Sequence, residues 1–201
     1  MIPIVCPAYL PNVQYCNWIL QQQQIHFTGS TTYQKQTFRN RSEIYGANGK
    51  LKLTVPIRHT HGIQKSLDQE VSIAYDTDWQ KQHWKSICAA YRSAPYFEFY
   101  EADLEPFYQE KIISLFEFNL KLLSQVMQLL EVSFTYKIVS WNPNAHKRMD
   151  HLIDAKQKVT TGFENYTQVF GTKFGFIPNL SILDVMFNLG PNTSSYLKTT
   201  H

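Results

Sequence analysis

The stretch from Trp79 to Tyr100, WQKQHWKSICAAYRSAPYFEFY, constrains the fold of this chain more than any other segment. Its large side chains recur at helical spacing, which places indole, imidazole, thiol and phenol groups on one face of a helix. These residues are Trp79, His83, Trp84, Ile87, Cys88 and Tyr91. Thr77 and Gln80 predict a capping box at the start of the helix. Pro95 predicts its end, and we expect an extended run of aromatic residues to follow.

Two interpretations of this helix remain open. An aromatic stripe at helical spacing usually packs in a core, where His83 would be a buried histidine donating to a backbone carbonyl. Alternatively, His83 and Tyr91 face a pocket, and His83 serves as a general base because an imidazole titrates near neutrality. In either case, burial beside Trp79 and Trp84 would lower the pKa of His83.

The chain has 201 residues, enough for one domain with a sizeable core, and we expect residues 1–201 to form that domain. Hydrophobic residues make up 43% of the sequence, which favours a globular protein over a disordered one. No apolar run approaches the roughly 18 residues that a membrane span needs, and the first residues lack a signal-peptide pattern. The odd number of cysteines, without C-x-x-C spacing, favours a cytoplasmic location over a disulfide framework.

The beginning of the chain reads as a strand at Ile2–Val5, a CPAYLP turn, a helix capped by Asn12 and a strand at Ile25–Thr28. This order is typical of a parallel α/β sheet, in which ligands bind beyond the carboxyl ends of the strands. The CPAYLP turn lies at such an end.

Alternating or apolar patterns predict further strands and helices. Strands are expected at Leu51–Ile57, Val71–Tyr75 and Phe134–Ile138, and helices from Pro106 to Leu130 and after Asn142. The fold class is therefore α/β, a single domain with a mostly parallel sheet of about five strands, flanking helices and a helical C-terminal half.

Positive charge is concentrated in one part of the sequence. Residues 31–65 hold seven basic residues and one acidic residue, a net charge of +6, whereas the whole chain carries +3. This asymmetry favours one anionic ligand site; nucleic acid, which needs a broad basic surface, is not an expected partner. Lys35, Asn40 and Arg41, with Arg39, form a cluster suited to phosphate or carboxylate. A solvated basic loop is the alternative.

Other polar residues have competing explanations. His59 and His61 could share one face of a strand, but a third metal ligand is missing nearby, so no metal site is expected. No cofactor-binding motif is present, and the cofactor stays unknown. Tyr9 stands between two prolines, and its hydroxyl would need a partner if buried. Ser181 and Asp184 match a capping box, which favours a structural role for Asp184.

Six segments together resemble the WbqC-like protein family, in the shorter form common in Bacteroidetes. They are PAYLPN, YQKQTFRNRSEIYG, KLTVPI, WQKQHWKSICAAYRSAPYFEFY, NYTQVFG and FIPNLSILDVMFNLGP, and they cover nearly the whole chain in the right order. The resemblance implies a cytoplasmic enzyme that modifies, or transfers onto, an activated sugar in the biosynthesis of O-antigen and other surface polysaccharides.

The family's opening pattern is often His-Gln-Pro-x-Tyr-Leu-Pro. Here Val5 and Cys6 replace the histidine and glutamine, which puts the activity of the chain in question if that histidine is essential. The remaining family positions are matched by Pro7, Tyr9, Leu10, Pro11, Lys35, Asn40, Arg41, Trp79, His83, Tyr166, Gln168, Pro178, Ser181 and Asp184.

Our first hypothesis is therefore a transferase-type enzyme acting on a nucleotide-activated or phosphorylated carrier. His83 would accept a proton, positioned by Tyr9 or Tyr91. Substrate binding would fall to Lys35, Asn40, Arg41, Trp79, Tyr166, Gln168 and Asp184. The second hypothesis is a non-catalytic binding or scaffold protein of a glycan pathway, because the His-Gln pair and a recognisable nucleophile are missing. The sequence does not indicate an oligomeric state.

Overall fold

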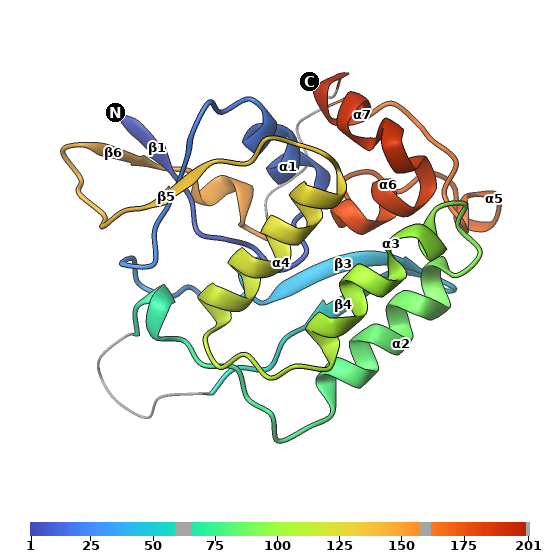
Figure 1. The fold of residues 1–201 in the computed structure, drawn as a ribbon, viewed down its shortest axis with the longest axis horizontal. Coiled ribbons are helices and arrows are strands. Elements are labelled where there is room, and N and C mark those ends of the chain that lie inside the picture. Colours follow the sequence, from blue (N-terminus) through green and yellow to red (C-terminus); the bar gives the residue numbers. More distant parts are fainter. Residues whose placement is uncertain (59–65, 157–161, 200–201) are drawn as a thin grey trace.

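A computed structural model describes residues 1–58, 66–156 and 162–199 (Figure 1). The strands are β1 (Ile2–Ile4), β2 (Ile25–Phe27), β3 (Arg41–Gly46), β4 (Gly49–Thr54), β5 (Tyr136–Ile138) and β6 (His146–Arg148). The α-helices are α1 (Val13–Leu20), α2 (Trp79–Tyr91), α3 (Phe97–Leu104), α4 (Leu115–Leu129), α5 (Gly171–Phe174), α6 (Ile182–Leu189) and α7 (Thr193–Thr199). Short 3₁₀ turns are η1 (Asp68–Glu70), η2 (Glu105–Tyr108), η3 (Asp150–Leu152) and η4 (Gly190–Asn192). The α/β class expected from the sequence is confirmed.

Four strands run parallel at one end of the molecule. β1 pairs with β6, β2 pairs with β5, and a parallel bridge between Val5 and Phe27 joins the two pairs. Backbone bonds from Val5 N to the His26 carbonyl and from Thr28 N to the Val5 carbonyl, 3.1 and 3.0 Å long, make this junction. The spatial order is therefore β5-β2-β1-β6. β2 and β5 lie on one side of β1, and β6 lies on the other side.

The remaining two strands form an antiparallel hairpin, so the sheet differs from the five-stranded arrangement that the sequence suggested. β3 and β4 pair from Arg41 opposite Thr54 to Gly46 opposite Gly49. Gly49 has φ +96°, a conformation that glycine adopts readily, and it closes the turn of the hairpin after Asn48. In Figure 1 the hairpin crosses the middle of the molecule, between α6 and α2.

α2 begins and ends close to the expected positions, but its first turn differs. The N-cap is Asp78, not Thr77, and no side chain caps the helix there. The predicted capping box is wrong because the side-chain amide of Gln80 is bound elsewhere, to η2 and the residues that follow it. It donates to the carbonyls of Phe107 and Glu110, over 3.1 and 2.6 Å.

The aromatic residues after Pro95 form a helix, so the extended run expected there is wrong. Phe97, Tyr100 and Leu104 are the buried residues of α3, at spacings of three and four. Phe97 and Tyr100 lie against Phe187 of α6, with ring centroids 5.1 and 6.4 Å apart. Burial against a distant helix therefore decides the local structure.

Other elements also differ from those that the sequence predicted. The helix predicted from Pro106 begins only at Leu115, where the Ser114 hydroxyl accepts from Glu117 N. Within the described residues 143–156, the helix expected directly after Asn142 is absent. The chain there forms β6, which pairs with β1, and then η3. Residues 71–75 make isolated bridges to Ile57 and Ser114 and not a strand. Pairing with distant segments overrides local pattern in each case.

The apolar core is continuous from the parallel strands to the C-terminal helices. α4 contributes the longest buried face, which includes Phe118, Leu122 and Met127, and α6 is buried along most of its length. Across the three described ranges, no helix combines the length and apolar character of a membrane span.

Candidate functional site

The segment between β2 and β3 folds back over the end of β1. Tyr9 N donates to the Phe38 carbonyl, and Phe38 N donates to the Ile153 carbonyl, over 3.0 and 2.8 Å. An antiparallel bridge joins Thr37 to Asp154. The turn after β1, the segment between β2 and β3 and the chain after β6 therefore meet at the carboxyl ends of the parallel strands.

A polar groove of about 450 Å³ lies between these segments. Its lining includes Lys35, Thr37, Asp150, His151, Asp154 and Lys156. Ligands of open parallel sheets bind beyond the carboxyl ends of the strands, where strand order reverses, and β1 and β6 form such a point here. The groove is within the size range of small-molecule sites. Its position and its mixed charges make it the candidate ligand site.

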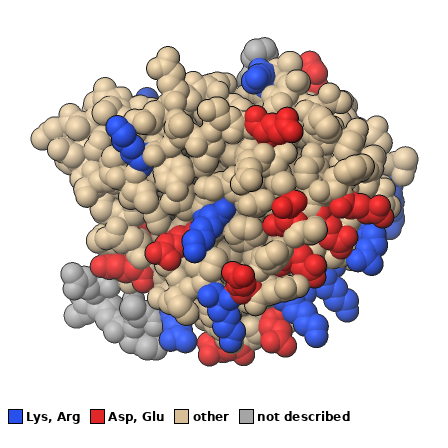
Figure 2. All heavy atoms as spheres, viewed as in Figure 1, with Lys and Arg blue, Asp and Glu red and all other residues tan. Residues whose placement is uncertain are grey.

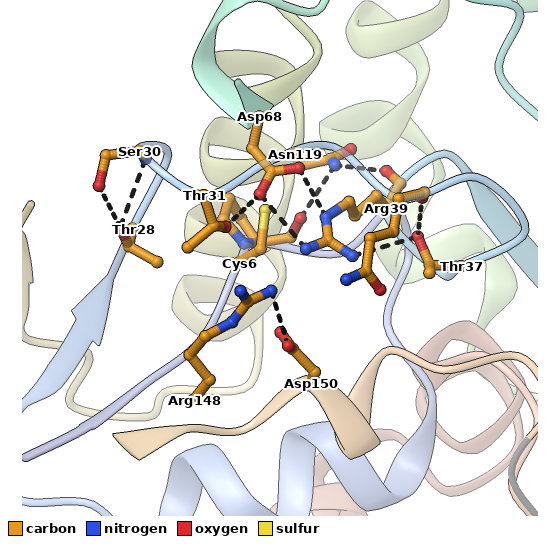
Figure 3. A network of polar contacts seen from close by, with 12 residues as sticks. Cys6, Thr28, Ser30, Thr31, Thr37, Arg39, Asp68, Asn119, Arg148 and Asp150 are labelled. Carbon is orange, nitrogen blue, oxygen red and sulfur yellow. Dashed lines mark hydrogen bonds and ion pairs between the residues drawn. The ribbon is translucent and has the colours of Figure 1, made fainter. Parts of the chain in front are cut away.

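Beneath the groove lies a buried ion pair between Arg39 and Asp68 (Figure 3). Arg39 Nε lies 2.7 Å from Asp68 Oδ1, and each side chain is 2% exposed. The Thr31 hydroxyl donates to Asp68 Oδ2 over 2.6 Å, and Arg39 Nη1 donates to Thr37 Oγ1 over 3.4 Å. Thr37 thus belongs to both the network and the groove, so the ion pair fixes one wall of the groove.

Electrostatic effects in this network oppose one another. Burial raises the pKa of Asp68, while Arg39 and the Thr31 hydrogen bond pull it downward. Burial also raises the pKa of the Cys6 thiol, and Asp68 adds to this effect, so Cys6 is held as a neutral thiol. Arg148 of β6 pairs with Asp150 over 2.7 Å and adds a second guanidinium near Asp68.

Asn119 links this network to α4. Its Nδ2 donates to the carbonyls of Pro7 and Arg39, over 3.1 and 2.6 Å, and the residue is 1% exposed. The turn after β1 and the Arg39 backbone are thereby held on the inner face of α4, as Figure 3 shows.

A second buried cluster joins Tyr9 to His83 and Tyr108. The Tyr9 hydroxyl lies 2.8 Å from His83 Nδ1 and 3.1 Å from the Tyr108 hydroxyl. His83 also hydrogen-bonds the backbone of Thr54. A carbonyl can only accept, so the ring nitrogen facing Thr54 carries the proton and Nδ1 accepts from Tyr9. Tyr9 in turn accepts from Tyr108.

Burial lowers the pKa of His83 to about 4, against 6.5 for the free side chain. The Trp79 indole lies edge-on to the imidazole, with ring centroids 5.1 Å apart, and excludes water from it. His83 is thus a neutral histidine, 7% exposed, whose hydrogen bonds tie α2 to the β1 turn and to β4.

The third cluster surrounds Asp184 of α6. Its Oδ2 accepts from the Tyr166 hydroxyl at 2.5 Å and from Gln168 Nε2 at 2.8 Å. Burial raises the pKa of Asp184, and hydrogen bonds from Tyr166, Gln168 and Tyr91 oppose that rise. Ser181 is the N-cap of α6 as expected, but the Asp184 carboxylate does not complete a capping box. Ser181 N instead donates to the Glu43 carbonyl, so the capping explanation of Asp184 is wrong.

The structure thus separates the residues selected from the sequence into different places. Lys35 lines the groove. Tyr9, Trp79 and His83 lie together in the core beside it, and Tyr91, Tyr166, Gln168 and Asp184 form the Asp184 cluster. Asn40 donates its side-chain amide to the Val55 carbonyl, and half-buried Arg41 opens β3. His59 and His61 lie outside the described residues.

Two of the basic residues within the described stretch 31–58 are paired with acidic side chains in the fold. Asp68 neutralises Arg39 in the interior, and Glu43 pairs with Lys50 over 3.0 Å at the surface. In the view of Figure 2, basic and acidic side chains are interspersed and do not gather in one positive patch. Within residues 1–58, 66–156 and 162–199, no group of three histidine, cysteine or acidic side chains is arranged to hold a metal ion.

Sequence reasoning missed several residues of these networks, among them Asp68, Tyr108, Asn119, Asp150 and Lys156. Asn119 interrupts the apolar stripe of α4, and a polar residue on an otherwise buried helical face is a signal that it has a buried partner. Asp150 and Lys156 carried no such signal, because their place in the fold depends on the pairing of β6 with β1, which no local pattern indicates.

The chain has recognisable relatives among known proteins. Residues 6–162 match the WbqC-like protein family. The protein named "Uncharacterized protein Rv1507c" from Mycobacterium tuberculosis is 26% identical over 230 aligned positions, which cover 98% of this chain and 97% of that protein. No solved structure matches the chain significantly. The family match spans most of the sequence and includes the β1 turn, the Arg39–Asp68 pair and the groove walls, so the chain belongs to the WbqC-like protein family.

Proposed function

We propose that this protein binds a small phosphorylated, hydroxyl-rich ligand, such as a nucleotide-activated sugar, in the polar groove beyond β1 and β6. We further propose that it acts on that ligand as a cytoplasmic, transferase-type enzyme of surface-polysaccharide biosynthesis. The observation that supports this most is the groove itself, which places Lys35, His151 and Lys156 beside Asp150 and Asp154 at a parallel-strand switch point.

The mixed charges of the groove suit such a ligand. Ammonium groups of Lys35 and Lys156 can pair with phosphate oxygens as point charges. The carboxylates of Asp150 and Asp154 can accept hydrogen bonds from sugar hydroxyls. A purely anionic ligand without hydroxyls would meet two carboxylates and gain less, so the groove favours a sugar phosphate over inorganic phosphate.

His151 and His83 have different roles in this function. His151 is exposed in the groove, and an imidazole is the side chain that most often accepts a proton in catalysis. His83 acts as a positioning residue: it holds Tyr9, whose backbone N–H binds the Phe38 carbonyl in the segment that carries Lys35. Asn40 and Arg41 have an indirect role as well, because they fix the start of β3, directly after the segment that carries Lys35.

Binding is tested with UDP-glucose, UDP-N-acetylglucosamine and glucose 1-phosphate, by thermal shift and calorimetry. A bound ligand raises the melting temperature by mass action. Replacing Lys35 by Ala should weaken binding about 10- to 100-fold, the effect of losing one charge-assisted hydrogen bond. Lys52→Ala is the matched control, because Lys52 is an exposed lysine on β4. If none of the three compounds raises the melting temperature at saturation, the proposal is wrong.

A non-catalytic binding protein is the second candidate. Val5 and Cys6 are 2% and 5% exposed, so the positions that replace the family's His-Gln pair present no polar group to the groove. A ligand that binds in the groove but is recovered unchanged after prolonged incubation with hydroxyl and amine acceptors would favour this candidate over the enzyme.

A further inference from the structure

We propose that Cys6, Arg39, Asp68 and Asn119 enclose a binding site for one water molecule, between the turn after β1 and the inner face of α4. A cavity of about 10 Å³ lies there, and its lining includes these four residues together with Pro7 and Phe116. About 10–15 Å³ of this kind of volume holds one water. The size therefore fits a water molecule and excludes any organic ligand.

The orientation of the Asn119 amide is fixed by its neighbours. Two groups that can only accept, the carbonyls of Pro7 and Arg39, face one end of the amide. That end must be the Nδ2 donor, so the ambiguity between nitrogen and oxygen that affects many asparagines is absent here. Oδ1 is therefore the atom at the other end.

Asn119 Oδ1 is an acceptor that needs a donor. The atom is fully buried, and no donor within the described residues reaches it. A buried polar atom without a hydrogen bond destabilises a fold, because it loses its bond to water and gains nothing in return. Native proteins avoid this by placing ordered water at such atoms, and Asn119 lines a cavity of the required size.

The remaining lining groups complete the hydrogen bonding of a water. One water hydrogen can bind Asn119 Oδ1 and the other the Asp68 carboxylate, while the neutral Cys6 thiol can donate to the water oxygen. Buried waters make about three hydrogen bonds, which matches this set. A cation is disfavoured because the Arg39 guanidinium lines the same cavity.

This water site is separate from the proposed ligand groove, and its role is to stabilise the packing of the chain. Four segments meet around it: the turn with Cys6 and Pro7, the segment between β2 and β3 with Arg39, η1 with Asp68, and α4 with Asn119. The water adds a hydrogen-bonded connection among the turn after β1, η1 and α4, through Cys6, Asp68 and Asn119.

A high-resolution crystal structure of the unliganded protein tests the proposal directly. We expect one water peak within 3.2 Å of Asn119 Oδ1, the usual hydrogen-bond limit. An Oδ1 that contacts a protein donor instead, a cavity without a peak, or a peak with the short, six-fold contacts of a metal ion would each overturn the proposal. None of these outcomes depends on whether the groove binds a sugar phosphate.

Two variants sharpen the test. Asn119→Leu removes the acceptor and should leave no water peak, whereas Cys6→Ala keeps Asn119 and should retain it. If Asn119→Leu does not fold, water–protein NOE spectroscopy on the wild type replaces it. A long-lived water should then give cross-peaks to the Asn119 Nδ2 protons that persist in Cys6→Ala, which lacks the exchangeable thiol proton. Loss of those cross-peaks in Cys6→Ala would overturn the proposal.

Discussion

Arg39 and Asp68 show, at the scale of single residues, how polar side chains are accommodated inside this fold. Their charges are removed from water, and each gains neighbours that satisfy it, from Thr31 and Thr37. Such a pair contributes little compared with an apolar pair of the same volume, but the loss of one partner leaves a buried charge uncompensated.

Replacing Asp68 by Asn should therefore lower the free energy of unfolding by about 3–5 kcal/mol, because Arg39 keeps its charge without a counterion. Urea denaturation measures this change. Glu43→Gln is the control, since the Lys50–Glu43 pair is at the surface and should contribute about 0–1 kcal/mol. Equal effects of the two substitutions would show that the Arg39–Asp68 pair is not buried as described.

His83 makes stability depend on pH. Its pKa in the folded protein is about 4, below 6.5, so the unfolded chain binds more protons between these values. The contribution of His83 is fully present above pH 6.5 and is lost as pH falls towards 4. Linkage gives a loss of about 3 kcal/mol over that interval.

The measurement compares wild type with His83→Gln by denaturant unfolding at several pH values from 7 to 4. Asp68 and Asp184 have raised pKa values and titrate with the opposite sign, but they are common to both proteins and cancel in the comparison. A constant difference between the two proteins over this range would contradict the buried, neutral His83.

At the scale of elements, the sequence predicts structure well where the signal is local. Asn12 caps α1 as expected, with Oδ1 accepting from Tyr15 N, and β1, β2 and β5 lie where their apolar patterns indicate. β6 could not be foreseen, because His146–Arg148 becomes a strand only by pairing with β1. α3 is similar, since its helix forms through burial against α6.

The segment 163–177 is a further element whose position depends on a few polar contacts. Tyr166 and Gln168 bind Asp184, and Tyr45 of β3 donates to the carbonyls of Phe170 and Gly175, 3.2 and 2.7 Å away. Because Asp184 carries a buried carboxyl group, its hydrogen bonds attach the segment to α6 more strongly than neutral ones would. The bonds from Tyr45 attach the segment to β3 as neutral hydrogen bonds.

Tyr166→Phe should lower the free energy of unfolding by about 1.5–3 kcal/mol, the loss of a hydrogen bond to a charged group. It should also speed amide hydrogen exchange within residues 163–177 while leaving exchange in α4 unchanged. Tyr136→Phe is the matched control, because Tyr136 is 39% exposed. Unchanged exchange in the segment would show that Asp184 does not hold it.

At the scale of the whole molecule, the parallel strands β5-β2-β1-β6 direct their carboxyl ends to one place, where the groove lies. The turn after β1 and the position of Lys35 could be related to this end from the sequence alone, through the general rule for parallel sheets. The position of the opposite wall, Asp150 to Lys156, could not be predicted, because it depends on the pairing of β6 with β1. The hydrogen bond between Tyr9 and His83 could not be predicted either, because the two residues are far apart in sequence.

The groove as ligand site is tested most directly by mapping amide chemical shifts while UDP-glucose or glucose 1-phosphate is titrated into the labelled protein. We predict saturable shifts confined to residues 34–37 and 150–156, which weaken in Lys35→Ala and persist in Lys52→Ala. Shifts that centre on another surface, or no saturable shifts with either compound, would contradict a ligand site at the carboxyl ends of β1 and β6.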